Sequence, residues 1–379
     1  MTQFLENLVS TNGLLVGTII PFVIVLTIVV FVHEMGHYLV GRWCGIGVQA
    51  FSIGLGPELF GFTDKRGTRW KFSLIPLGGY VKFLGDMNAT STPDPEAVAN
   101  LTEEQKRAAF HTQPVWKRAA TVFAGPLFNF LLTIAVFAVF IFIYGKIVTE
   151  PMVAQVQPNS PAAAAGFQPG DRFLEVDGSP ISSFDEVQRI VQRRAGDPIT
   201  FVMRRGEGEV TLVATPEVRE QQDALGNPVK VGIIGVQNDE KLGQPRTVTY
   251  SAPAALREAV SETGAIIALT GQFLKRVVTG REDRCQLGGP IKIAKMSGQA
   301  AALGPEWLIQ LVALLSVGIG ILNLLPIPPL DGGHLAFYAV EAVIRRPVSE
   351  RAMDLVYRVG FLAVMTFMLF VFWQDIFGC

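Results

Sequence analysis

The chain has 379 residues, of which 49% are hydrophobic and only 17% are charged, and its mean hydropathy is +0.36. Soluble domains carry roughly 25% charged residues, so this composition excludes an ordinary soluble protein and indicates a membrane protein. The net charge is −1, and no basic patch is interleaved with aromatic residues, which argues against a nucleic-acid partner. The cysteines are too few and too far apart for a disulfide framework or a CxxC zinc site, although a bridge between Cys285 and Cys379 stays open.

Four apolar runs are long enough to cross a bilayer as helices. They cover residues 13–32, 119–144, 307–325 and 359–373. No basic residue precedes the first run and no small-residue cleavage site follows it, so we expect a retained helix and not a signal peptide. An even number of spans places both ends of the chain on the same side of the membrane.

Basic residues near the spans predict the orientation. Lysine and arginine gather between the first and second spans and again between the third and fourth, whereas residues 1–12 and 374–379 contain none. By the positive-inside rule, both of these connections face the cytoplasm and both termini face outward. Residues 146 to about 305 then lie outside the cytoplasm.

The connection after the first segment (residues 1–45) has two parts. Residues 46–85 alternate apolar and polar side chains with period two and predict strands or hairpins. They are so apolar that we expect a membrane-associated β-hairpin region, covered by the helices because bare strand edges cannot face lipid. A small cytoplasmic β subdomain is the alternative. Residues 86–116 are expected to form an exposed cytoplasmic linker.

Residues 150–217 combine short β-rich runs, the turn sequences QPGD and DGSP, and one amphipathic helix near Asp185–Arg194. This pattern resembles a bacterial PDZ domain, which binds extended peptides at a sheet edge. Residues 218–304 hold weakly amphipathic helices that we expect to lie on the outer membrane surface. A fifth span there would put Arg345 and Arg346 on the outer face, against the charge rule.

The sequence HEMGH ends the first span. His33 and His37 are four residues apart, so a helix places them on one face, close enough to share a metal ion. Glu34 lies beside the pair, where a carboxylate can accept a proton from a metal-activated water. Ionisable residues in a spanning helix are costly and usually functional, so we interpret the motif as a metal site. A polar cluster at a helix end is the alternative.

A catalytic zinc site needs a third protein ligand. The third segment, residues 305–340, contains NLLPIPPLDGGH (residues 323–334), in which three prolines within four positions break the helix. Irregular backbone at membrane depth is tolerated only where it is buried or lines a cavity, which favours Asp331 as the third ligand. His334 is the alternative ligand, and His111 in the linker is expected to be an ordinary surface residue.

Several of these features together resemble one family. HEMGH in the first span, GPLFN (Gly125–Asn129) in the second segment (residues 117–146), one PDZ-like domain and NLLPIPPLDG in the third are similar to the site-2 protease family of intramembrane zinc metalloproteases. The resemblance is closest to the bacterial regulator-of-sigma-E type. Better known enterobacterial members carry two PDZ domains in tandem, whereas this chain has one.

The resemblance implies one Zn²⁺ per chain, held by His33, His37 and Asp331, with Glu34 as general base and acid. It also implies that Asn323 hydrogen-bonds the substrate backbone. Two prolines would keep that segment unwound, and a strand would pair with an extended substrate; these residues are Pro326, Pro328, Gly79, Tyr80, Val81, Lys82 and Phe83. Asn129 is either part of the site or a polar residue in helix packing.

We therefore expect a polytopic α-helical membrane protein with four transmembrane helices, the last within residues 341–379, a membrane-associated β-hairpin region and one extracytoplasmic PDZ-like α+β domain. The resemblance implies a bacterial inner-membrane enzyme whose active site lies toward the cytoplasm. It would cut single-span substrates, such as a membrane-anchored anti-sigma factor or a signal-peptide remnant, after trimming by another protease.

Three other functions use some of the same residues. A two-His-one-carboxylate iron oxygenase would share the ligand types but has no use for Glu34. A PDZ scaffold with a vestigial HExxH motif would hold no zinc. A metal transporter would need a polar pathway, and the second and fourth spans carry almost no ionisable residues.

Overall fold

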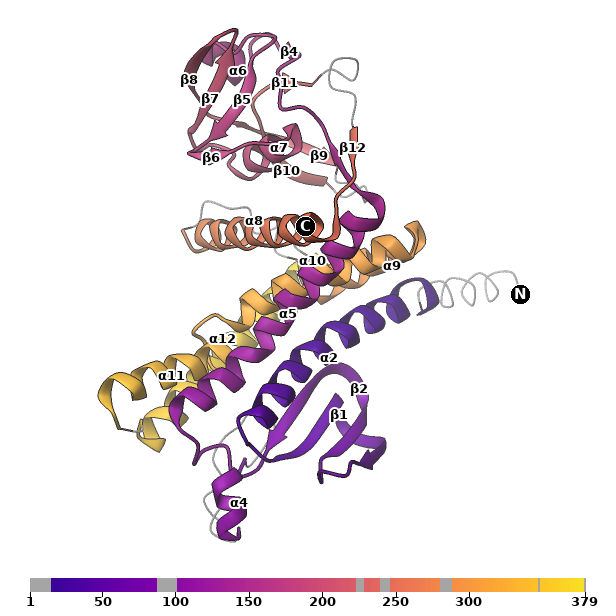
Figure 1. Ribbon diagram of the computed structural model, residues 1–379, viewed down its shortest axis with the longest axis vertical. Coiled ribbons are helices and arrows are strands. Elements are labelled where there is room, and N and C mark those ends of the chain that lie inside the picture. The colour runs from indigo at the N-terminus through magenta and orange to yellow at the C-terminus, as the bar shows by residue number, and fades with distance from the viewer. Residues whose placement is uncertain are drawn as a thin grey trace, which may run out of the picture. The chain divides into compact units, whose positions relative to one another are not determined.

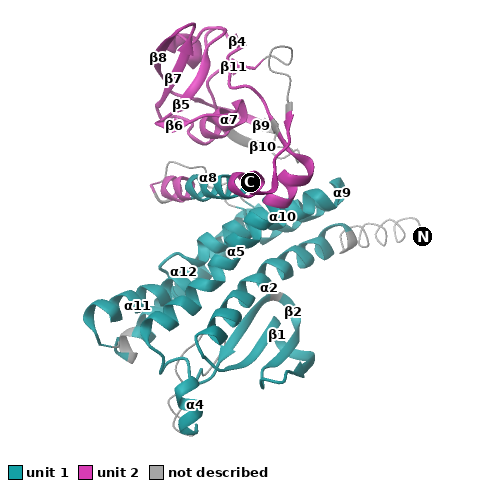
Figure 2. Ribbon diagram, in the orientation of Figure 1, with its two compact units in different colours: residues 1–137, 259–270, 287–379 teal, residues 138–258, 271–286 magenta. Residues whose placement is uncertain are grey.

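The computed structural model describes residues 15–86, 101–222, 228–238, 246–279, 288–346 and 348–377. The bridge left open between Cys285 and Cys379 lies outside these residues, as does the stretch 87–100 of the linker. The chain divides into two units, one of residues 1–137, 259–270 and 287–379 and the other of residues 138–258 and 271–286 (Figure 2).

Four helices in the described residues are long and apolar enough to cross a membrane. They are α2 (Ile20–Trp43), which follows the π-helical turn η1 (Leu15–Ile19), α5 (Val115–Tyr144), α10 (Pro305–Asn323) and α12 (Glu350–Phe377) (Figure 1). Each overlaps one of the four apolar runs expected from the sequence. The prediction of a multi-pass membrane protein is therefore confirmed.

Tryptophans mark the ends of these helices. Trp43 ends α2 and Trp116 lies in the first turn of α5, while Trp307 and Trp373 lie near the start of α10 and the end of α12. All four side chains are exposed, as is typical of residues at a membrane–water interface. At 1.5 Å per residue, His33 lies roughly 15 Å along α2 from Trp43, within the apolar part of the span.

Helix α2 packs closely against other elements of its unit. Val25 and Val29 are fully buried and contact Val312 of α10. Further along, Gly36 lies so close to α5 that a side chain there would strike the Ala124 carbonyl oxygen. Glycine in a helix interior costs roughly 1 kcal/mol of helix stability relative to alanine. Here the absence of a side chain at Gly36 permits the close crossing of the two helices.

The β region forms a sheet beside α2 (Figure 1). It consists of β1 (Val48–Thr63) and β2 (Arg69–Phe83). Residues 48–53 pair with 79–83 on one side, and residues 50–53 pair with 69–72 on the other. Residues 60–63 also pair with 69–72. The order across the sheet is therefore 79–83, 48–53, 69–72, 60–63, so the segment 79–83 lies at an edge.

One part of this sheet is buried and the other exposes apolar side chains. Phe51 is fully buried, and its ring stacks on Trp70 and meets Tyr38 of α2 edge-on. The exposed apolar side chains are Leu55, Leu59, Phe60, Phe62, Leu74 and Ile75. Such a cluster is uncommon on a monomeric soluble protein. Insertion of this part of the sheet into the bilayer stays a prediction.

The linker before α5 differs from our expectation. We expected residues 86–116 to be exposed, but the later part of this range folds back on the sheet. After the short helix α4 (Glu103–Ala108), the Phe110 N–H donates to the Leu84 carbonyl, and the Phe110 side chain is fully buried. The polar composition of the linker gave no sign of this contact, because its partners are distant in the sequence.

The third membrane segment is broken where the prolines predict. Helix α10 ends at Asn323, residues 324–330 are not helical, and α11 (Asp331–Ile344) begins at Asp331. Gly333 packs directly on the broken stretch, since a Cβ there would come within 2.6 Å of the Pro328 nitrogen. The glycines after Asp331 therefore let α11 start close against the break.

The second unit contains the PDZ-like domain. Its central sheet has the strand order β6–β5–β7–β8. The helix expected near Asp185–Arg194 is confirmed as α7. The strands and helices of this part of the chain are β3 (Lys146–Val148), β4 (Gln155–Val156), α6 (Pro161–Ala165), β5 (Arg172–Val176), β6 (Ser179–Pro180), α7 (Phe184–Arg193), β7 (Ile199–Arg205), β8 (Gly208–Ala214), β9 (Glu217–Gln222), β10 (Pro228–Ile233), β11 (Val236–Gln237) and β12 (Arg246–Val248).

The PDZ-like domain extends beyond the expected boundary at residue 217. Strands β9 and β10 pair with each other, and β11 pairs with β4 near the start of the domain. Ile234 is buried in the same core as Val153 and Phe173. The boundary at 217 was wrong because the strand that completes this core comes after a polar hairpin, where the sequence suggests that the domain has ended.

Two helices, α8 (Ala252–Val278) and α9 (Pro290–Leu303), lie between this domain and the third span in the sequence. Neither is among the candidate spans found in the described residues. The Asp375 carboxylate near the end of α12 accepts hydrogen bonds from the backbone N–H groups of Gly289, Ile291 and Lys292, at 3.0, 3.0 and 3.2 Å. It thereby caps the first turn of α9.

This cap predicts the effect of one substitution. Asp375→Ala leaves these N–H groups without their acceptor and should lower the free energy of unfolding by about 1–2 kcal/mol. The matched control is Asp354→Ala on the same helix, because Asp354 is 61% exposed and, among the described residues, pairs only with Arg358. Thermal unfolding in detergent measures both variants. Equal stability losses would contradict the capping role.

Candidate metal centre

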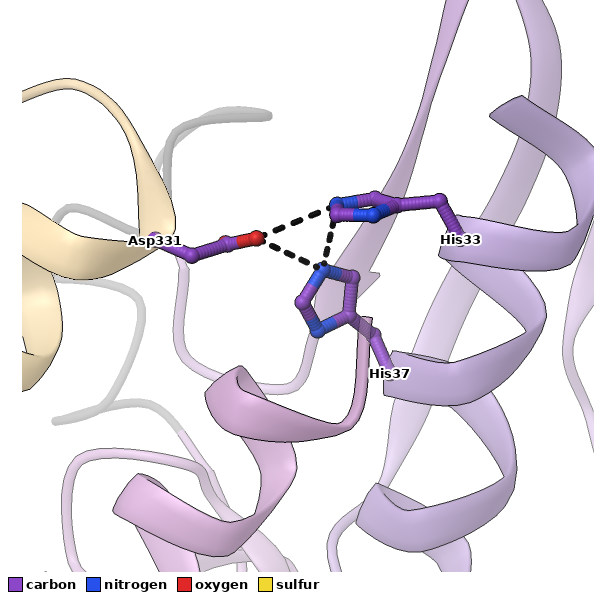
Figure 3. Close-up of side chains that lie close together, drawn as sticks. All are labelled: His33, His37 and Asp331. Atoms are coloured by element: carbon purple, nitrogen blue, oxygen red, sulfur yellow. Dashed lines mark hydrogen bonds and ion pairs between the residues drawn. The ribbon is translucent and has the colours of Figure 1, made fainter. Parts of the chain in front are cut away.

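Three candidate metal ligands lie close together in the first unit (Figure 3). His33 and His37 come from successive turns of α2, and Asp331 is the first residue of α11. The Asp331 Oδ2 atom lies 3.1 Å from His33 Nε2 and 3.5 Å from His37 Nε2, and the two nitrogens are 3.2 Å apart. The side chains are only 9%, 10% and 17% exposed. The fold therefore brings together three residues that are almost 300 positions apart in the sequence.

The spacing of these atoms fits a zinc ion. Zinc bonds of about 2.0–2.2 Å in tetrahedral directions separate the ligand atoms by about 3.3–3.6 Å. The three observed separations, 3.1, 3.2 and 3.5 Å, form a triangle of nearly that size. A carboxylate buried at membrane depth also calls for a positive partner. Two imidazoles and one carboxylate are common ligands of catalytic zinc.

Glu34 lies between the ligand pair and the sheet. The backbone N–H of Val81, in the edge segment 79–83, lies near the Glu34 carboxylate. A Cβ added to Gly79 would come within 3.2 Å of Glu34 Cγ, so the edge segment passes directly beside this side chain. The group of three ligands does not include Glu34. Glu34 therefore lies beside the ligand group and next to a strand edge.

The GPLFN motif of α5 lies against both histidines. A Cβ at Gly125 would strike the His37 ring and come within 2.9 Å of the His33 ring. One turn before it, the Thr121 carbonyl accepts a hydrogen bond from His37 Nδ1 at 2.9 Å. One turn after it, the fully buried Asn129 places its amide nitrogen 3.2 Å from His33 Nδ1. Sequence reasoning left Asn129 undecided and missed Thr121, because a backbone acceptor has no residue signature.

The remaining expected site residues lie at different distances from the ligands. Asn323 ends α10, and its amide nitrogen is 3.4 Å from His33 Nε2. Pro326 and Pro328 lie in the unwound stretch between α10 and α11. The strand residues 79–83 form the sheet edge beside Glu34. Among the described residues, the side chains of Tyr80 and Lys82 make no hydrogen bond or ion pair with the three ligands.

Two other histidines have partners of their own. His334, the alternative ligand, lies with its ring against the Tyr357 hydroxyl, 2.8 Å from Nδ1, and is not part of the ligand group. His111 is not an ordinary surface residue, because its Nε2 lies 3.0 Å from the fully buried carboxylate of Asp86. That carboxylate also accepts the backbone N–H of Phe83 and so holds the end of the edge strand. The expectation for His111 was wrong, since its partner is in another part of the chain.

The site and its fold have counterparts among known proteins. The family model described as peptidase family M50 matches residues 21–367. The protein named "Putative zinc metalloprotease" of Mesorhizobium japonicum is 68% identical over 364 residues, which cover 96% of this chain and 99% of that protein. "Metalloprotease MmpA" of Caulobacter vibrioides is 39% identical over 380 residues, covering 94% and 95%. The PDZ domain of an SdrC-like protein from Listeria monocytogenes is 21% identical over 26% of this chain and 93% of that chain, with a TM-score of 0.19, which is too low to bear on the fold.

A HExxH helix, a candidate carboxylate ligand from a broken span and a match over most of the chain define a membrane-embedded zinc metalloprotease. The chain belongs to peptidase family M50, the site-2 proteases. The family resemblance drawn from the sequence motifs is therefore confirmed.

The close contact between Gly125 and the two imidazole rings predicts that this position is sensitive to substitution. Gly125→Ala adds a methyl group that collides with both imidazoles, so it should displace them and abolish stable zinc binding. Gly318→Ala is the matched control, because a Cβ at this glycine of α10 meets nothing within 4 Å. Zinc content is measured by elemental analysis of the purified variants. Full zinc content in Gly125→Ala would show that the rings do not depend on this close contact.

Proposed function

We propose that His33, His37 and Asp331 hold one zinc ion per chain and that Glu34 is the general base and acid of peptide-bond hydrolysis. The observation that carries this proposal is the triangle of ligand atoms, 3.1 to 3.5 Å on a side, with Glu34 beside it. When bound, zinc supplies the Lewis acid that activates water toward a peptide carbonyl. Glu34 accepts a proton from the attacking water and returns it to the leaving amide nitrogen, so the two products are a carboxylic acid and an amine.

We further propose that the substrate is cut as an extended chain. In a transmembrane helix each carbonyl is enclosed by the neighbouring turns, so the cleaved segment must unwind before its carbonyl reaches Glu34. Unwinding in the membrane leaves backbone groups without partners, which costs several kcal/mol for each group. The edge segment 79–83 runs beside Glu34 and offers replacement hydrogen bonds along its free side. Asn323, next to His33, is suited to hold the substrate backbone close to the ligand group.

The substrate class follows from the depth of the site. His33 and His37 lie within the apolar part of α2, so we propose that the enzyme cuts single-span membrane proteins, such as an anti-sigma factor or a signal-peptide remnant, by regulated intramembrane proteolysis. Prior trimming by another protease fits a chain with a PDZ-like domain, which takes up newly made peptide ends. Lys117 and Arg118 adjoin the interfacial Trp116, which supports a site facing the cytoplasm in the inner membrane.

Separate roles for base and ligands give the first test of this function. Glu34→Gln should abolish cleavage while zinc content stays near that of the parent, because Glu34 is not in the ligand group. Asp331→Ala should lose both cleavage and zinc. Zinc content and cleavage of a single-span reporter substrate are measured on the same purified samples.

The outcomes separate the competing functions. Zinc loss in Glu34→Gln equal to that in Asp331→Ala would overturn the assignment of base and ligand. A folded parent protein that contains no zinc would support a PDZ scaffold instead. Zinc transport into vesicles without any cleavage would support a transporter.

The proposed substrate form gives a second prediction. Glycine or proline placed near the cut site of the substrate should raise the cleavage rate, because these residues weaken the helix by roughly 1 and 3 kcal/mol. A run of leucine at the same positions should lower it. Initial rates on reconstituted substrates that differ only at these positions provide the measurement. Faster cleavage of the leucine substrate would contradict the requirement for an unwound chain.

A further inference from the structure

Helix α5 presents a regular set of residues to the HExxH motif. Thr121, Gly125 and Asn129 are spaced by four positions and therefore lie on one face of the helix. Thr121 contacts His37, Gly125 lies under both rings, and Asn129 contacts His33. The two histidines thus receive their outer hydrogen bonds from the same helix, two turns apart. This arrangement suggests that α5 sets the orientation of both imidazoles.

The Thr121 contact defines the protonation of His37. A backbone carbonyl only accepts hydrogen bonds, so the Nδ1 atom 2.9 Å away must carry the hydrogen. The Nε2 atom of a neutral His37 then has a free lone pair, which faces Asp331 Oδ2 at 3.5 Å. His37 is therefore held in the form that binds a metal through Nε2.

The Asn129 contact allows either form of His33. With its NH₂ group toward His33 Nδ1, as the 3.2 Å contact shows, the amide pairs with a ring whose hydrogen is on Nε2, the form that cannot bind a metal there. In this orientation the Asn129 Oδ1 atom is buried without a hydrogen-bond partner. A half-turn of the amide, whose two ends are nearly equal in shape, brings Oδ1 to Nδ1 as an acceptor. His33 then carries its hydrogen on Nδ1, like His37.

The hydrogen bonds between packed helices do not explain why residue 129 has a side-chain amide. The contact between α5 and α10 at this level uses the Asn129 backbone carbonyl, which accepts the hydroxyls of Thr133 and Ser316 at 3.2 and 3.0 Å. Thr133 also donates to the Ala313 carbonyl at 2.9 Å. The buried side-chain amide of Asn129 takes no part in these bonds. Its one hydrogen-bond contact among the described residues is His33.

We propose that Asn129 is a positioning residue that sets the tautomer of His33, with its side-chain oxygen accepting the Nδ1 hydrogen when His33 offers Nε2 to the metal. This inference rests on the proposed zinc site. It also explains the GPLFN motif as one device, in which Gly125 makes room for the rings and Asn129 orients one of them.

The test compares two replacements of similar size in the full-length protein. Asn129→Asp keeps an acceptor and cannot donate, whereas Asn129→Leu removes both functions. Thr133→Val is the matched control, since it removes another fully buried polar group one turn along the same helix without touching a histidine. Zinc affinity is measured in detergent by competition with a chelator of known affinity, and unfolding of the zinc-free proteins is measured separately.

We expect Asn129→Leu to weaken zinc affinity about 10- to 100-fold, the usual effect of losing an outer partner of a metal-binding histidine. Asn129→Asp should bind zinc at least as tightly as the parent, because a carboxylate fixes the metal-binding tautomer and balances the charge of the ion. Thr133→Val should match the parent. The zinc-free unfolding temperatures of the parent and Asn129→Asp should be similar.

Two results would overturn the inference. One is unchanged zinc affinity in Asn129→Leu. The other is a folded Asn129→Asp protein that loses zinc, and this variant decides the question even if Asn129→Leu does not fold. A parent protein without zinc would instead contradict the proposed function itself, and this inference with it. Normal zinc binding by the parent together with either of the two results would remove only the role of Asn129.

Discussion

The close crossing of α2 and α5 is the contact on which the site depends. Gly36 of HEMGH lets the Ala124 carbonyl approach α2, and Gly125 of GPLFN passes under the rings of His33 and His37. With larger residues at either glycine, the helices would separate and the outer hydrogen bonds of both histidines would be lost. Dispersion and hydrogen bonding hold helices together in lipid, so small residues at such a crossing have a direct energetic role.

A second constraint brings Asp331 to the two histidines. A continuous helix could not place a ligand here, because the backbone must leave the helical path before α11 begins. Pro326 and Pro328 remove helical donors and so break the helix at this point. Gly333 packs on the Pro328 nitrogen, and Gly360 of α12 meets the Pro328 carbonyl. The break is thus a packed feature and supports a fixed ligand position.

The sequence predicted the parts of this protein that depend on local patterns. The four spans follow from apolar length, the facing of His33 and His37 follows from helical spacing, and Asp331 follows from the proline break. Contacts between distant segments carried no such pattern. The contact of His111 with the buried Asp86 carboxylate and the late strand β11 of the PDZ-like domain could therefore not be derived from the sequence.

In the mechanism we propose, the edge segment 79–83 and Glu34 act as one functional element. An exposed edge is normally a liability, since it invites pairing with other chains. Here the segment 79–83 borders α2, its end is fixed by the Asp86 carboxylate, and its Val81 N–H reaches Glu34. In that mechanism, a substrate that pairs along this edge is brought to Glu34 by the same backbone that replaces its lost helical hydrogen bonds. A single interaction then offsets the cost of unwinding in the membrane and positions the bond that is cleaved.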